Sequence, residues 1–190
     1  MNLFAGFATF ISLIEAIALS RILIGLAYLI EQKHRVTWSW VFVTWGIFFV
    51  IAITDQWWQL FVMWEGFSSF TIHEFWYLLI SPVLFVFISA LFFPRFPDTG
   101  HIDLWEHFNR VRPWCFTLGA LYIITYIPEA AMVASKRGQP FTSELSLGEV
   151  ASTITMAILF AVGAFVHSRK YHAFLPPAVI LLFLGFYFCS

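Results

Sequence analysis

Residues 12–21 read SLIEAIALSR and place two opposite charges, Glu15 and Arg21, inside an otherwise apolar run that extends from Leu3 to Ile30. A run of this length can cross the hydrocarbon core of a bilayer as one helix, so both charges are predicted to lie within the membrane. A charge at that depth costs several kcal/mol (about 2.5–3.5 on insertion scales) unless it is paired or faces water. The rest of the chain is therefore predicted to shield and pair this segment.

The composition of the chain also indicates a membrane protein. Of its 190 residues, 61% are hydrophobic and only 11% are charged, against about 25% charged in a typical soluble domain. A soluble core in so short a chain cannot absorb that much apolar surface, whereas lipid can. We expect a single transmembrane domain over residues 1–190 with membrane lipids as its surroundings. The net charge of −1 gives no reason to expect nucleic acid as a partner.

Six segments come close to the ~20 apolar residues that a membrane-spanning helix needs. They cover residues 3–30, 37–64, 75–93, 114–134, 147–166 and 173–188. The sequence therefore predicts an all-α integral membrane protein with six transmembrane helices arranged as three hairpins. No basic region precedes the first segment, so it is expected to be a retained helix rather than a signal peptide.

The basic residues predict the orientation of these helices. Seven Lys and Arg residues fall in the first, third and fifth connections, and two fall in the fourth: Lys33, Arg35, Arg95, Arg110, Arg112, Arg169 and Lys170 against Lys136 and Arg137. Because Lys and Arg concentrate on the cytoplasmic side, loops 1, 3 and 5 are expected in the cytoplasm and both termini outside, in the cell inner membrane. Trp64 and Trp76 flank the outer turn between the second and third segments, and we interpret them as interfacial anchors.

Further charges fall within the predicted spans. Asp55 lies nine residues, or about 13 Å, below Trp64 if the second helix is continuous; the alternative ends that span near Ile53 and lays the rest on the membrane surface. Side chains in a helix lean toward its N-terminus, so Arg21 and Asp55 lean toward each other, and their contact is predicted. Glu129 lies at a comparable height in the fourth span.

Two interpretations of these buried groups remain open. In the first, Glu15, Asp55 and Glu129 line a path for a proton or cation, with polar help from Gln56 and Gln59, and Arg21 is the internal counter-charge. A buried carboxyl group can then exchange protons. In the second, the same residues form a fixed network that specifies helix partners and conducts nothing.

The connection before the fourth span has a pattern of its own. Residues 101–112 read HIDLWEHFNRVR, with apolar residues on one face, and predict an amphipathic cytoplasmic surface helix between the third and fourth transmembrane helices. His101, Asp103 and His107 are weak candidate ligands for a divalent metal, since imidazole and carboxylate suit zinc or iron. No standard zinc spacing such as HExxH occurs, so we expect an ordinary linker with no metal and no cofactor.

Enzyme signatures such as GxSxG, the P-loop, GxGxxG and CxxC do not occur in the sequence. We therefore expect a small ion channel or transporter, selective for cations or protons, that acts as a homo-oligomer. The main alternative is a non-catalytic membrane scaffold or partner subunit, and the third is an intramembrane enzyme that uses the same buried groups.

Overall fold

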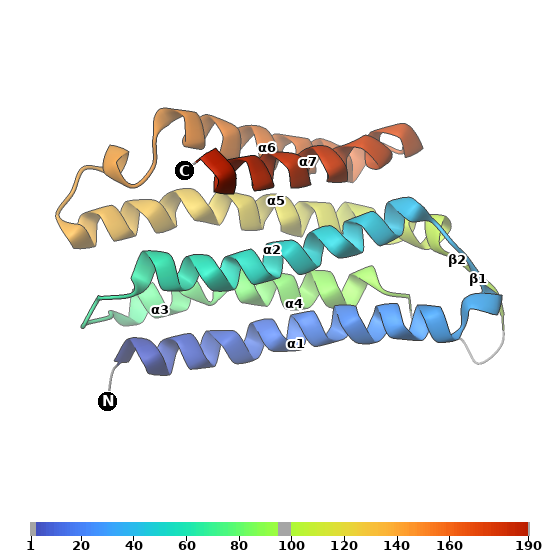
Figure 1. The fold of residues 1–190 in the computed structure, drawn as a ribbon, viewed down its shortest axis with the longest axis horizontal. Coiled ribbons are helices and arrows are strands. Elements are labelled where there is room, and N and C mark those ends of the chain that lie inside the picture. Colours follow the sequence, from blue (N-terminus) through green and yellow to red (C-terminus); the bar gives the residue numbers. More distant parts are fainter. Residues whose placement is uncertain (1–2, 95–99, 190) are drawn as a thin grey trace.

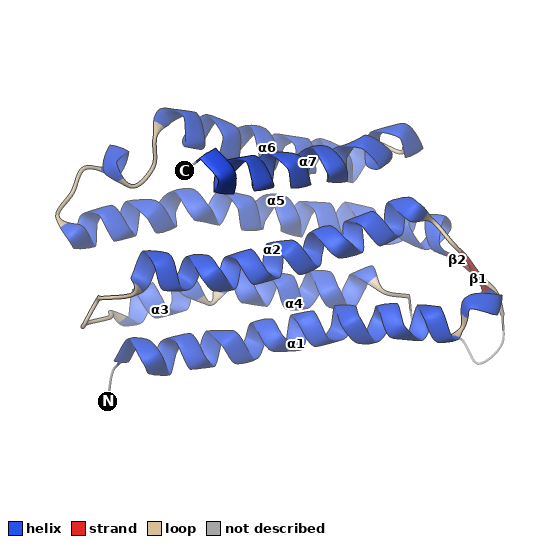
Figure 2. Ribbon diagram, in the orientation of Figure 1, coloured by secondary structure: helices blue, strands red, loops and turns tan. Residues whose placement is uncertain are grey.

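The computed structural model describes residues 3–94 and 100–189, with side chains described for residues 4–94 and 100–181. Almost all of this part of the chain is helical (Figure 2). The α-helices are α1 (Leu3–Glu31), α2 (Trp40–Trp64), α3 (Ile72–Leu78), α4 (Ile80–Phe92), α5 (Leu104–Arg137), α6 (Leu147–Phe165) and α7 (Arg169–Cys189). Two short 3-10 helices, η1 (Lys33–Arg35) and η2 (Phe141–Ser143), and two short strands, β1 (Val36–Thr37) and β2 (Ile102–Asp103), lie between them.

The helices run up and down in one bundle (Figure 1). Helices α1, α4 and α6 end where α2, α5 and α7 begin, and β1 and β2 lie at this end, which we call the strand end. The opposite end, where α1 begins and α7 ends, we call the terminal end. α1 packs against α2 and α4, α5 packs between α4 and α6, and α7 packs against α2 and α6.

Five helical stretches in the part of the chain searched are long and apolar enough to cross a membrane. They are Phe4–Glu31, Trp40–Trp64, Ile72–Phe92, Leu104–Arg137 and Leu147–Phe165. The all-α, multi-pass class predicted from the sequence is therefore confirmed. α2 continues as a helix past Ile53 to Trp64, which favours the interpretation that keeps Asp55 inside the bundle.

The predicted separate surface helix is corrected by the structure. Residues 104–112 form the first turns of α5, which continues through Pro113 and Pro128 without a break. A proline inside a helix removes only one backbone hydrogen bond, and membrane helices tolerate this where neighbouring groups satisfy the freed carbonyl. Arg95, which the sequence analysis counted among the cytoplasmic charges, lies outside the described residues.

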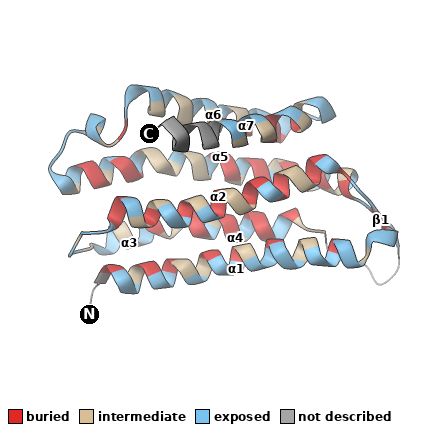
Figure 3. Cartoon of the chain, in the orientation of Figure 1, coloured by how far each residue is buried: buried red, intermediate tan, exposed pale blue. Residues whose placement is uncertain are grey.

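Helix α1 has a buried stripe that sets how it packs. The buried positions recur at alternating steps of four and three residues along most of the helix (Figure 3): Phe4, Ala8, Ile11, Glu15, Ala18, Ile22 and Leu29. This spacing is the seam that one helix presents to its neighbours in a bundle. Glu15 therefore occupies a core position of the seam, and Arg21 does not.

Phenylalanine rings and glycines fit α5 and α6 closely together. A Cβ atom added to Gly163 would lie 2.5 Å from the ring of Phe116, and one added to Gly119 would lie 2.7 Å from the ring of Phe160. Each helix thus inserts a ring where the other has no side chain, as small residues permit at helix interfaces in membranes.

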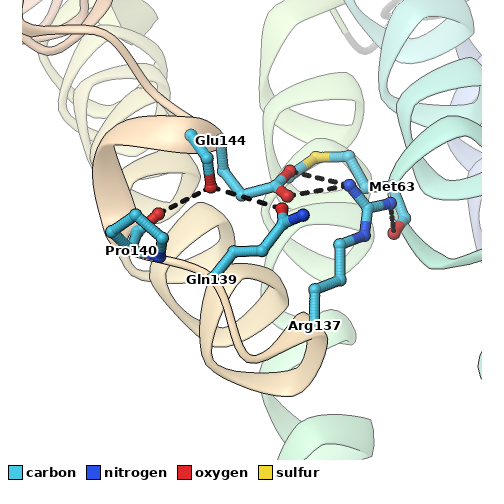
Figure 4. A network of polar contacts seen from close by, with 6 residues as sticks. Met63, Arg137, Gln139, Pro140 and Glu144 are labelled. Atoms are coloured by element: carbon cyan, nitrogen blue, oxygen red, sulfur yellow. Dashed lines mark hydrogen bonds and ion pairs between the residues drawn. The ribbon is translucent and has the colours of Figure 1, made fainter.

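Polar contacts fasten both ends of the bundle. At the strand end, β1 and β2 pair in parallel and Arg35 Nε donates to the carbonyl of Gly100 at 3.0 Å. At the terminal end, Arg137 pairs with Glu144 at 2.8 Å and donates to the carbonyl of Met63 at 3.1 Å (Figure 4). These contacts join α5 to α2 and to the connection that follows it.

A second ion pair at the terminal end holds the neighbouring basic residue. Lys136 Nζ pairs with Glu74 at 2.8 Å and lies over the ring of Phe70 at 4.6 Å from the centroid. Both basic residues at this end of α5 are therefore neutralised by acidic partners.

Candidate functional site

Glu15 brings a carboxyl group into the interior of the helical bundle. It lies about 18 Å along α1 from Leu3, near the middle of the 29-residue helix, and only 3% of its surface is exposed. Neither of its carboxyl oxygens has a hydrogen-bond partner among the described residues. A buried carboxyl group without partners is costly, so a property other than stability is expected to account for it.

Glu129 brings a second carboxyl group into the same region from α5. It is 4% exposed and lies within electrostatic range of Glu15. Its Oε1 accepts a hydrogen bond from Trp64 Nε1 at 2.8 Å. This donor holds one side of the Glu129 carboxyl group in place, whereas the Glu15 carboxyl group has no such contact among the described residues.

Asp55 and two tyrosines extend the cluster toward the centre of the bundle. Tyr122 on α5 is partly buried and lies within electrostatic range of Glu15, Asp55 and Glu129. Tyr126, one turn further along α5, lies within range of Asp55 and Glu129. The three carboxyl groups predicted from the sequence are thus all within electrostatic range of Tyr122, and we call Glu15, Asp55 and Glu129 the acidic site.

The two predicted glutamines accompany Asp55 on α2. Gln59 makes a side-chain hydrogen bond to Asp55 and is partly buried. Gln56 is buried, with 8% of its surface exposed. The polar run at the centre of α2 therefore belongs to the bundle interior, where uncharged amides can satisfy a neighbouring carboxyl group.

Arg21 does not join the acidic site, and the predicted contact with Asp55 is wrong. Arg21 is exposed on α1, and the hydrogen bonds and ion pairs found between described residues do not include it. Its position falls between Ala18 and Ile22, off the line that faces α2 and α4. The prediction rested on how side chains lean along a helix and not on the direction in which Arg21 faces around α1.

The prediction for Trp64 is also wrong. It was interpreted as an interfacial anchor, yet it is fully buried and hydrogen-bonded to Glu129. Trp76 by contrast is 63% exposed, as an interfacial anchor should be. Neither Trp64 nor Tyr122 was predicted from the sequence as a neighbour of the acidic site. For Tyr122 a signal was available: it lies seven residues before Glu129, which places both on one helical face.

The weak metal candidates are engaged elsewhere. His101 Nε2 lies 2.6 Å from Thr37 Oγ1, and His107 Nε2 lies 3.0 Å from the carbonyl of Phe92. Asp103 caps α5, accepting backbone N–H bonds of 2.7 and 3.0 Å from its first turn. Within residues 3–94 and 100–189, no three His, Cys, Asp or Glu side chains gather in a way that could hold a metal ion.

Comparisons of the chain with protein-family models, with curated protein sequences and with solved structures find no match.

Proposed function

We propose that the protein moves protons across a membrane, as a small channel or transporter, and that Glu15 and Glu129 bind the proton. The observation that carries this proposal is the pair of nearly fully buried carboxyl groups within electrostatic range of each other. No ion pair between described residues supplies either of them with a basic partner. Two negative charges are very unfavourable in an apolar interior, so the site is electrically balanced when a mobile positive charge is bound.

A proton fits the acidic site better than a metal cation does. Hard cations take about six or more oxygen ligands, but one oxygen of Glu129 already accepts from Trp64 and Asp55 is bonded to Gln59. A proton needs a single oxygen. Ser12, Tyr122 and Tyr126 provide hydroxyl groups on α1 and α5 that can extend a proton path. A cation-selective path remains the alternative that the flux measurement below distinguishes.

The topology proposed with this function has α7 as a sixth span and the strand end in the cytoplasm of a cell with an inner membrane. The two basic residues at the terminal end, Lys136 and Arg137, are ion-paired, which reduces the positive charge on that side further. The exposed Lys33, Arg169 and Lys170 lie at the strand end, as the positive-inside rule requires. In this topology the amphipathic first turns of α5 lie at the membrane surface, and the protein acts as a homo-oligomer.

The proposal is tested by proton flux into liposomes that contain purified protein. Wild type is expected to carry protons under an imposed pH gradient, and Glu15→Gln and Glu129→Gln to abolish the flux while still eluting as folded protein. Glu31→Gln is the matched control, because Glu31 is the exposed last residue of the same helix, and its flux should equal that of wild type. Replacing the proton gradient by a sodium or potassium gradient tests the cation alternative.

A scaffold is the second candidate function, and the bond between Trp64 and Glu129 favours it. In that case the carboxyl groups specify which helices pair. Wild-type protein without flux, together with misfolding of the Glu129→Gln variant, would support the scaffold and contradict the proton path.

A further inference from the structure

A second group of buried polar side chains lies at the strand end, away from the acidic site. Phe108, Arg112 and Phe116 follow one another at four-residue steps on one face of α5 and are at most 1% exposed. Arg112, predicted to be a loop charge, therefore lies inside the bundle, with a phenylalanine one helical turn to either side of it. Burying a guanidinium is costly unless it is paired.

His172 on α7 packs against the same face. Its ring lies 5.1 Å from the ring of Phe108 and 5.1 Å from that of Phe116, nearly perpendicular to both. Phe108 and Phe116 lie one helical turn before and after Arg112, so His172 packs on the face of α5 that carries Arg112, and the two basic groups are within electrostatic range. His172 is itself fully buried.

Neither basic group has an acidic partner among the described residues. Arg112 Nη1 donates to Asn109 Oδ1 at 2.9 Å, but Arg112 Nε has no hydrogen-bond partner there. His172 Nε2 lies 2.9 Å from the carbonyl of Val166, and since a carbonyl only accepts, Nε2 is the protonated nitrogen. His172 Nδ1 has no partner among the same residues.

One further unpartnered donor belongs to a residue that contacts the ring of Phe116. Trp45 Nε1 on α2 is buried without a hydrogen-bond partner in the described part of the chain. The Trp45 ring lies 4.5 Å from that of Phe116, which in turn contacts His172. Buried polar groups are nearly always satisfied, so the unpartnered atoms of Arg112, His172 and Trp45 call for a partner that the described residues do not supply.

We propose that Arg112 and His172 bind a small oxyanion of the phosphate type between α5 and α7. Arg112 Nε–H donates to one ligand oxygen, in a charge-assisted bond of the kind that guanidinium groups form with oxyanions. His172 Nδ1, when neutral, accepts from a ligand hydroxyl group. A singly protonated oxyanion such as hydrogen phosphate or bicarbonate provides both an acceptor and a donor.

This site identifies an anion as the solute that moves with the proton. The acidic site is balanced by a positive charge and the basic site by a negative one, so together they suit coupled uptake of an anion and a proton. The coupling rests on the proposed function, whereas the anion site does not. A fixed buried guanidinium also opposes the passage of free cations, as basic residues do in other pores.

Thermal unfolding in neutral detergent tests the anion site with inorganic phosphate as the probe. At constant ionic strength set with chloride, the midpoint of wild type should rise steadily with the logarithm of phosphate concentration, as ligand linkage requires. Arg112→Gln should lose this rise. Arg110→Gln is the matched control and should keep it, because Arg110 is exposed on the same helix. Should Arg112→Gln fail to fold, His172→Gln and binding of radiolabelled phosphate to wild type serve in its place.

Nanodiscs separate a free anion from a lipid headgroup. In phosphate-free buffer, stabilisation by phosphatidylglycerol over phosphatidylcholine that requires Arg112 assigns the occupant to lipid and overturns the coupling to transport. A phosphate effect equal in wild type and Arg112→Gln, or no phosphate effect, overturns the site. Phosphate binding without proton flux supports the anion site and overturns the proposed function. Proton flux without phosphate binding supports the proposed function and overturns the anion site.

Discussion

At the scale of single residues, charge and burial are combined in an unusual way in this protein. Glu15, Glu129 and Arg112 occupy positions where the packing pattern of their helices calls for apolar side chains. The depth of Glu15 could be predicted from the apolar run around it. The side that Arg21 faces could not be predicted. Six residues turn a helix by about 240° beyond one full turn, so Glu15 and Arg21 face different sides, and only the neighbouring helices decide which of them faces inward.

Substitution by leucine separates the two glutamates of the acidic site. Glu15→Leu is expected to raise the free energy of unfolding by about 1–3 kcal/mol, because it removes a buried polar group that has no described partner. Glu129→Leu is expected to lower it by about the same amount, since it leaves Trp64 Nε1 buried without an acceptor. Both are measured by reversible denaturation in detergent micelles.

The sign of the Glu15→Leu effect decides between a working site and a structural one. A group retained for function at a cost in stability gives a more stable but inactive variant. A loss of stability in Glu15→Leu would show that Glu15 holds the bundle together and would count against the proton site.

At the scale of helices, the junction of α5 and α6 depends on the contacts between glycine and phenylalanine. Gly163→Ala should lower the free energy of unfolding by about 1–3 kcal/mol through overpacking, because the new Cβ would lie 2.5 Å from the ring of Phe116. Gly6→Ala is the matched control: nothing lies within 4 Å of its Cβ position, so the stability should stay unchanged or rise slightly. Equal losses in both variants would refute this account of the junction.

The positions of the helices could largely be predicted from hydropathy, but the continuity of the predicted surface helix with the fourth span could not. The apolar segments correspond to α1, α2, α3 with α4, α5, α6 and α7, but α5 begins ten residues before the predicted fourth span at Trp114. Pro113 suggested a boundary, yet the cap from Asp103 starts the helix earlier and one lost backbone bond does not end it. The boundary predicted at Pro113 also explains why Arg112 was assigned to a loop, whereas it lies within α5 and is buried.

At the scale of the whole molecule, the proposed topology has the strand end and the terminal end on opposite sides of a membrane. Cysteine labelling tests this topology, with single cysteines at two exposed positions in a background with Cys115→Ala and Cys189→Ala. Thr142→Cys should react with a membrane-impermeant maleimide in intact cells, and His167→Cys only after permeabilisation. The opposite pattern would invert the proposed topology, and labelling of both in intact cells would refute a bundle that spans the membrane.

The gathering of the acidic site could be predicted only in part. The sequence identified three carboxyl groups at similar heights, and the structure brings them together around Tyr122. It could not identify Trp64 as the donor to Glu129, because that bond joins residues 65 positions apart and tryptophan near a helix end is ordinarily an interfacial residue.

If Glu15 and Glu129 exchange a proton inside the bundle as proposed, pH-difference infrared spectroscopy of the protein in liposomes will detect the exchange. We expect a protonated-carboxyl band that changes between mildly acidic and mildly alkaline pH, is altered or lost in Glu15→Gln and Glu129→Gln, and is preserved in Glu31→Gln. Identical difference spectra for wild type and all three variants would contradict it, because the two buried carboxyl groups would then hold no exchangeable proton.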